Sequence, residues 1–80
     1  MDDAQILRRI ETLVEEEREL RERKATGEMA DDAHARLQEL EVGLDQAWDL
    51  LRQRRALREF GENPDAAHTR DAKTVESFEQ

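Results

Sequence analysis

The chain has 80 residues, of which 42% are charged and only 4% aromatic, and its net charge is −8 at neutral pH. A chain of this length can form one small domain, and its charge puts nucleic acid and anionic membrane surfaces at an electrostatic disadvantage. Because there is no cysteine, disulfides, thiolate chemistry and cysteine-based zinc sites are excluded. No apolar run has the length of a signal-peptide core or a membrane span, so we expect a cytoplasmic protein without membrane contact.

The first predicted element is a helix over about residues 3–25, which Asp2 or Asp3 can cap. Apolar residues recur along it at helical spacing, and its opposite face is densely charged. The pattern breaks at Thr26 and Gly27, where glycine suits the left-handed residue that follows a helix. The apolar stripe consists of Ile6, Ile10, Leu13 and Leu20, widened by Leu7 and Val14.

The second predicted helix spans about residues 31–60 and mirrors the first across Gly27, as an antiparallel hairpin over residues 1–61 requires. Three charged pairs follow the same alignment: Arg8 with Asp49, Arg18 with Glu39, and Asp3 with Arg54. Agreement between charge and hydrophobicity strengthens the predicted alignment. The facing apolar pairs are Ile6 with Leu51, Ile10 with Ala47, Leu13 with Leu44, and Leu20 with Leu37.

Residues 62–80 are predicted to form a mostly irregular tail. The segment from Glu62 to Asp65 has the composition of a turn, and few apolar residues follow it. Val75 and Phe78 are the exceptions, and they could dock the tail onto the hairpin as an extended strap. A frayed tail is the alternative.

A lone hairpin leaves apolar side chains along its edges in a contiguous patch that soluble monomers seldom expose. The sequence therefore predicts an all-α, coiled-coil-like hairpin that dimerises into a four-helix bundle. A glycine within the second helix would allow another helix to approach closely. The candidate interface of this homodimer consists of Leu7, Val14, Gly43, Leu50 and Leu57.

Arginines cluster near the end of the second helix, beside the only tryptophan, and the cluster has two interpretations. It can be a surface that binds a protein partner or an anion through bidentate contacts. Alternatively, the cations offset the helix dipole and pair with Asp2, Asp3 and Glu59, which is the interpretation we favour. His34 and His68 lack metal-ligand spacing, so no metal or cofactor is expected. The candidate surface consists of Trp48, Arg52, Arg54, Arg55 and Arg58.

One enzyme family bears comparison. The run from Leu44 to Leu51, followed by Arg54, Arg55, Ala56 and Leu57, is similar to the long helix of the all-helical chorismate mutases. That family needs a further cationic helix after a loop, whereas only Arg70 and Lys73 follow Gly61 here. An enzyme of this type is therefore the lowest of the alternatives.

A closer resemblance covers the whole chain. Its most specific part runs from Leu40 to Gly61 around Trp48, and it extends to the opening Asp2–Ile6, the Gly27-Glu28 turn, Asn63-Pro64-Asp65 and Val75-Glu76. In these segments the chain resembles a family of small actinobacterial proteins of unknown function. The resemblance implies a helical fold and an intracellular setting, but no activity.

Together these observations predict a non-catalytic, homo-oligomeric protein-interaction or scaffold module, with a further protein as its possible partner. The helix carrying Trp48 and Arg55 would provide recognition, because aromatic and arginine side chains are frequent interface hot spots. The alternative is a module that binds an anionic ligand or nucleic acid through the arginine cluster, and nucleic acid is disfavoured by the net charge.

Overall fold

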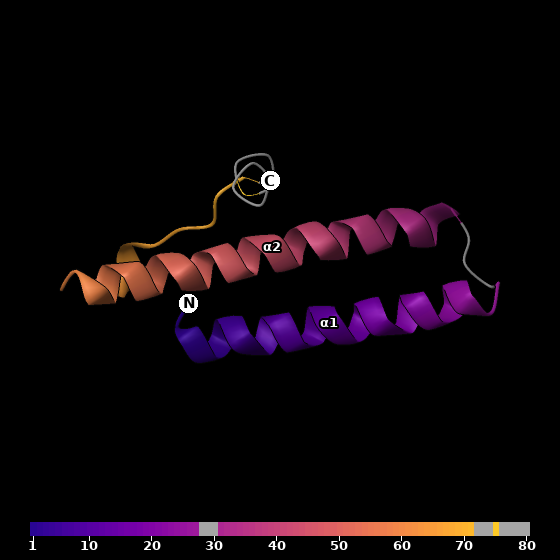
Figure 1. Ribbon diagram of the computed structural model, residues 1–80, viewed down its shortest axis with the longest axis horizontal. Coiled ribbons are helices and arrows are strands. Elements are labelled where there is room, and N and C mark those ends of the chain that lie inside the picture. Colours follow the sequence, from indigo (N-terminus) through magenta and orange to yellow (C-terminus); the bar gives the residue numbers. More distant parts are fainter. Residues whose placement is uncertain (28–30, 72–74, 76–80) are drawn as a thin grey trace.

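The computed structural model describes residues 1–27, 31–71 and 75. Two long helices, α1 (Asp3–Ala25) and α2 (Asp31–Glu59), lie side by side and antiparallel, and a short 3-10 helix, η1 (Pro64–Ala66), follows them (Figure 1). No strand occurs within the described residues. The predicted all-α fold with two packed helices is thus confirmed. Within the same residues, no helix combines the length and apolar character needed to cross a membrane.

Local sequence signals account for both ends of α1. Asp2 is the N-cap: its carboxylate accepts a hydrogen bond from the Gln5 N–H, and the Gln5 side-chain oxygen accepts one from the Asp2 N–H, both at 2.8 Å. This reciprocal capping box satisfies two backbone donors that helix geometry leaves without partners. At the other end Gly27 has a φ of +77° and donates to the Lys24 carbonyl.

The end of α2 is closed by a Schellman motif. The Glu62 N–H donates to the Leu57 carbonyl at 2.8 Å, and the Gly61 N–H donates to the Arg58 carbonyl at 3.1 Å. Gly61 adopts a φ of +73°, which a residue without a Cβ reaches at little cost. The motif turns the chain back towards α2, and Asn63 then caps η1.

The core lies between the two helices. Ile6, Ile10, Ala47 and Leu50 form its buried cluster, against which Leu44, Leu51 and Ala67 pack. Gly43 also faces this seam, because a Cβ placed on it would lie 3.6 Å from Leu13 Cδ1. Gly43 and Leu50 were expected at an oligomer interface, but the structure places both within the packing of a single chain. Gly43 thus faces α1 of its own chain, with room there for the methyl group of an alanine.

The charged pairs follow the predicted alignment only in part. Arg54 pairs with Asp3 as expected. Arg18, expected opposite Glu39, instead pairs with Glu15 and Glu22 of its own helix. Long side chains on a helix meet most easily three or four residues away, which explains this preference. Asp49, expected opposite Arg8, instead accepts from Gln53 and pairs with Arg70.

Among the described residues, further ion pairs away from the Asp3 end also link the two helices. Arg21 reaches Glu41 at 2.9 Å, and Arg36 reaches Glu16 at 3.0 Å. Each pair connects residues 20 positions apart in the sequence. They join α1 and α2 near the hairpin turn, whereas the Asp3–Arg54 pair joins them at the opposite end.

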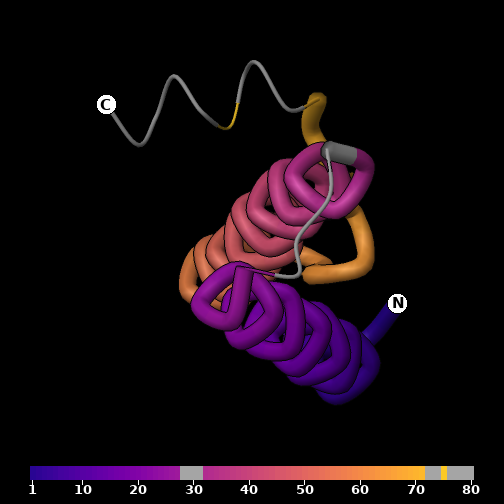
Figure 2. The backbone as a smooth tube through the Cα atoms, turned by 90° about the vertical axis from the view of Figure 1, so that its right-hand side faces the viewer, coloured from indigo at the N-terminus to yellow at the C-terminus, as the bar shows by residue number. Residues whose placement is uncertain are grey.

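Residues 62–71, which we call the strap, run back along α2. The Gln53 amide donates to the His68 carbonyl at 2.8 Å, and the Gln46 amide donates to the Arg70 carbonyl at 3.2 Å. Beyond the strap, Val75 is fully buried. Figure 2 shows the strap on one side of the two helices, the same side as the N-terminus. Docking of the tail, rather than fraying, is the arrangement observed for these residues; Phe78 lies outside the described ones.

Candidate functional site

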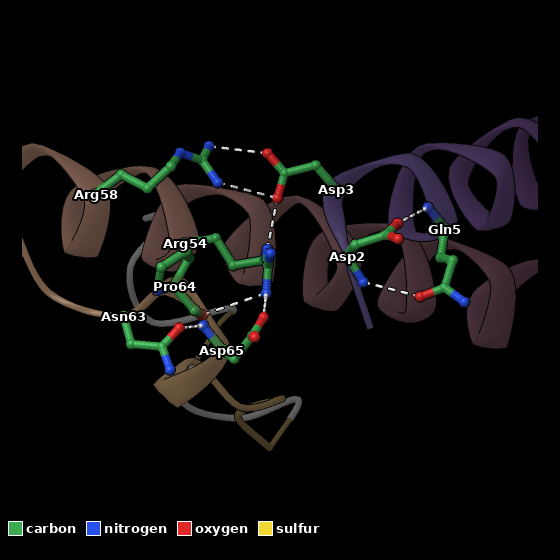
Figure 3. Close-up of polar contacts among 8 residues, drawn as sticks. All are labelled: Asp2, Asp3, Gln5, Arg54, Arg58, Asn63, Pro64 and Asp65. Atoms are coloured by element: carbon green, nitrogen blue, oxygen red, sulfur yellow. Dashed lines mark hydrogen bonds and ion pairs between the residues drawn. The ribbon is translucent and has the colours of Figure 1, made fainter.

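Arg54 is the centre of a junction between three elements (Figure 3). Its side chain is only 8% exposed, because it projects from α2 into the angle between the start of α1 and η1. The guanidinium donates to the carboxylates of Asp3 and Asp65, the latter at 2.9 Å, and to the Pro64 carbonyl at 3.3 Å. A planar guanidinium suits such a site because its donors diverge in fixed directions.

Arg58 adds a second cation to the same junction. Its guanidinium pairs with the Asp3 carboxylate at 2.8 Å, so Asp3 lies between two arginines. Hydrogen bonds from Arg58 and Arg54 hold the pKa of the Asp3 carboxyl below its ordinary value. The carboxylates of Asp3 and Asp65 in turn raise the pKa of Arg54. The junction is therefore an internally compensated ionic cluster.

The remaining members of the candidate arginine surface do not join this junction. Arg55 pairs with Glu59 one turn further along α2 and is largely exposed, while Arg52 is exposed. Trp48 keeps 45% of its surface exposed. Of the five residues, Arg54 and Arg58 belong to the junction. The other three lie on exposed parts of α2. Pairing of the cations with Asp3 and Glu59 is what the favoured interpretation of the cluster proposed.

Exposed apolar residues gather on a different surface, which we call the open face. Leu7 and Val14 on α1 are 44% and 45% exposed, similar to Trp48 on α2. Residues seven apart lie on nearly the same side of a helix. Leu7 and Val14 therefore share a row with Arg21, and Trp48 shares one with Glu41. Because Arg21 pairs with Glu41, both rows lie on one side of the hairpin.

The opposite side, the covered face, carries the strap. Arg9 and Gln46 lie two positions from Leu7 and Trp48 respectively, which is roughly 160° around each helix. Gln46 binds the strap, and Arg9 lines a cavity of about 240 Å³ together with Gln46 and Thr69. The strap therefore covers one apolar edge of the hairpin and leaves the other edge exposed. Leu57, also expected at the interface, is half-buried.

Sequence reasoning missed the side chains that hold the strap. Gln46, Gln53 and Asp65 each bond to groups far away in the sequence, and two of these bonds end on backbone carbonyls. A backbone carbonyl exists at every residue, so such bonds leave no pattern in the sequence. Asp65 did carry a signal, because it follows Asn63-Pro64 in a recognised turn, but that signal indicated a turn and no partner.

These surfaces define a small all-helical hairpin protein whose tail is docked along its second helix. The chain belongs to the family described as protein of unknown function (DUF2630), whose profile matches residues 2–80. This confirms the uncharacterised family that the residues around Trp48 resembled.

Three relatives are uncharacterised proteins, one from Mycobacterium bovis and two from strains of Mycobacterium tuberculosis. Each is 43% identical to this chain over 77 residues, and the match covers 95% of this chain and 88% of the relative. No solved structure matches the chain.

Proposed function

We propose that the protein is a non-catalytic, homo-oligomeric interaction module of the cytoplasm that contacts protein chains through its open face. The observation that carries this proposal is the asymmetry of the hairpin. One apolar edge is covered by the chain's own strap, whereas Leu7, Val14 and Trp48 remain exposed on the other. Clustered exposed apolar side chains of this kind mark interaction surfaces in soluble proteins.

The size of the core supports the same proposal. The described residues provide a narrow set of buried apolar side chains, drawn from one helix pair and Val75. Small chains without disulfides often gain their remaining stability by association. Because Leu7, Val14 and Trp48 are 44%, 45% and 45% exposed, their complete burial would contribute about 0.7–1.3 kcal/mol each.

The anion-binding alternative has weaker support. Arg54 and Arg58, two of its five residues, already share the carboxylate of Asp3, and Arg54 is nearly inaccessible. An incoming phosphate would have to displace that carboxylate and break the ionic link between α1 and α2 at this end of the hairpin. The net charge of −8 adds long-range repulsion, so nucleic acid is not part of the proposal.

The test is the absolute mass in solution, measured by light scattering coupled to size exclusion over a concentration series. We expect a mass near twice 9.4 kDa that falls on dilution. Leu7→Glu should shift the protein to a monomer, because it buries a charge in the contact. Arg9→Glu, which changes the covered face of the same helix, is the matched control and should leave the mass unchanged.

Two results would count against the proposal. One is a monomer at every concentration with the helical content intact. The other is a dimer that responds equally to Leu7→Glu and Arg9→Glu, because the contact would then not depend on the open face.

A further inference from the structure

Charged and apolar side chains follow one another along the open face in an order that restricts which surface can pack against it. Resting on the proposed function, we infer that its occupant is a second copy of this chain, docked about a two-fold axis parallel to the helices. In this arrangement α1 of each copy faces α2 of the other. Trp48 of each copy then enters the gap between Leu7 and Val14 of the other copy.

The alignment within the hairpin sets the level of Trp48. Leu13 contacts the Gly43 position, and Asp3 pairs with Arg54 one helix end away. Counting along both helices from these two contacts places Trp48 at a level between Arg8 and Arg9. That level lies between Leu7 and Val14, which are about 10 Å apart along the helix axis at 1.5 Å per residue. The gap is long enough to receive an indole ring.

A two-fold axis parallel to the helices keeps every residue at its own level. The second copy's α2 therefore meets α1 with the same alignment that α2 has within the chain. Since Arg21 already reaches Glu41 of its own chain, it faces Glu41 of the second copy as well. Two arginines and two glutamates then alternate around that end of the interface, so like charges are not placed together.

The other end of the face is complementary in the same alignment. Arg55 is largely exposed and lies level with Asp2 at the start of α1. Docking therefore brings a cation of one copy close to the acidic side chains at the start of α1 in the other, which is a contact between opposite charges. Along the open face, α1 therefore presents acidic, then apolar, then basic residues. At the same levels α2 presents a basic residue, an apolar one and an acidic one.

Side-chain size distinguishes this arrangement from the other symmetric one. An axis across the helices would instead set α2 against α2, which brings the two Trp48 side chains together, and α1 against α1, which brings together only the smaller Leu7 and Val14 rows. One pair of helices would then be held further apart than the other. When Trp48 of α2 instead packs against Leu7 and Val14 of α1, both pairs of facing helices have the same spacing. Equal spacing allows close packing along the whole interface. Each copy buries the same surface, which is the condition for a closed dimer.

Trp48 is the only tryptophan, so its indole protons give a unique signal in the unaltered protein. Isotope-labelled and unlabelled chains are mixed, and isotope-filtered NOE spectra are recorded on the dimer. The expected result is a set of intermolecular NOEs from the indole of one chain to the methyl groups of Leu7 and Val14 in the other. Intermolecular NOEs only between the two indoles would indicate the crossed axis and overturn the inference.

A pair of aromatic substitutions provides the second arm. Trp48→Ala should raise the dimer dissociation constant roughly thirtyfold or more, the effect of losing an interface hot spot. Phe60→Ala is the control, since Phe60 is 81% exposed and follows the end of α2, away from Trp48, and it should leave the dissociation constant unchanged. If Trp48→Ala and Phe60→Ala changed the dissociation constant equally, the inference would be overturned. A dimer without the Trp48 contacts defeats only this arrangement, whereas a monomer at all concentrations defeats the proposed function itself.

Discussion

Asp3 and Arg54 are 51 residues apart in the sequence, yet their side chains form the ion pair that closes the open end of the hairpin. The same guanidinium binds Asp65 and the Pro64 carbonyl, so one side chain connects the start of α1, the end of α2 and η1. Figure 3 shows these contacts converging on Arg54. Arg54, which the sequence offered both as part of a candidate binding surface and as the partner of Asp3, thus has the second of these roles in the structure.

Loss of Arg54 should destabilise the fold and release the strap together. Arg54→Met keeps the volume of the stem but removes the guanidinium that links Asp3 of α1 to Asp65 and the Pro64 carbonyl of η1. We expect a lower denaturation midpoint and faster amide hydrogen exchange over residues 64–71. The matched change Arg8→Met, at an exposed position of α1 away from the junction, should alter neither result clearly. Equal effects of the two changes would contradict the structural role of Arg54.

The Asp3 carboxyl should make stability depend on pH in the acid range. Its pKa is lowered in the folded protein from the ordinary value of 3.8, because Arg58 and Arg54 bond to the ionised form. This contribution is therefore complete above pH 3.8 and is lost as the pH falls through the lowered folded value. Denaturation midpoints measured from about pH 5 to about pH 2 should fall less steeply for Asp3→Asn than for the unaltered protein.

Glu11→Gln is the control for this pH experiment, because it removes one carboxylate of α1 away from the Arg54 junction. This change should leave the fall of the denaturation midpoint with decreasing pH nearly as steep as in the unaltered protein. If Asp3→Asn and Glu11→Gln gave the same pH profile, the junction would not be the source of the acid sensitivity.

Gly43→Ala should stabilise the protein. The new Cβ would lie 3.6 Å from Leu13 Cδ1, an ordinary van der Waals contact, and alanine favours a helix over glycine by about 1 kcal/mol. We expect the free energy of unfolding to rise by roughly 0.5–1 kcal/mol, measured by denaturant titration. A loss of stability on this change would mean that the two helices approach more closely in solution than this spacing allows.

Gly61→Ala should have the opposite effect. Gly61 has a φ of +73° in the Schellman motif, where a Cβ costs about 1–2 kcal/mol. Gly61→Asn should recover part of this loss, because asparagine tolerates the left-handed region better than alanine. If alanine and asparagine behaved alike and close to glycine, the motif would not be maintained in solution.

Val75 should contribute to stability as a core residue, although it lies beyond the strap. It is fully buried, so Val75→Ala is expected to lower the free energy of unfolding by about 1–2 kcal/mol. Val42→Ala, at a half-buried position of α2, should cost less. The comparison requires only thermal or denaturant melts. A smaller effect at Val75 than at Val42 would show that the tail does not dock in solution.

The sequence by itself determined the features that depend on near neighbours. Asp2 caps α1, Gly27 and Gly61 end the helices, and the apolar stripe from Ile6 to Leu13 specifies the side that packs, because helical periodicity places these residues within a turn or two of one another. One long-range pair, Asp3 with Arg54, was also predictable, since it lies in the alignment that the apolar residues impose.

Only the tertiary structure decided which edge of the hairpin the tail covers. The strap is held by Gln46 and Gln53 through bonds to backbone carbonyls, which no side-chain pattern reveals. The same is true of Gly43, whose position against Leu13 in the packing of one chain is not apparent from the sequence. Local propensity fixes helices and their ends, but contacts between distant segments depend on a geometry that exists only once the helices have packed.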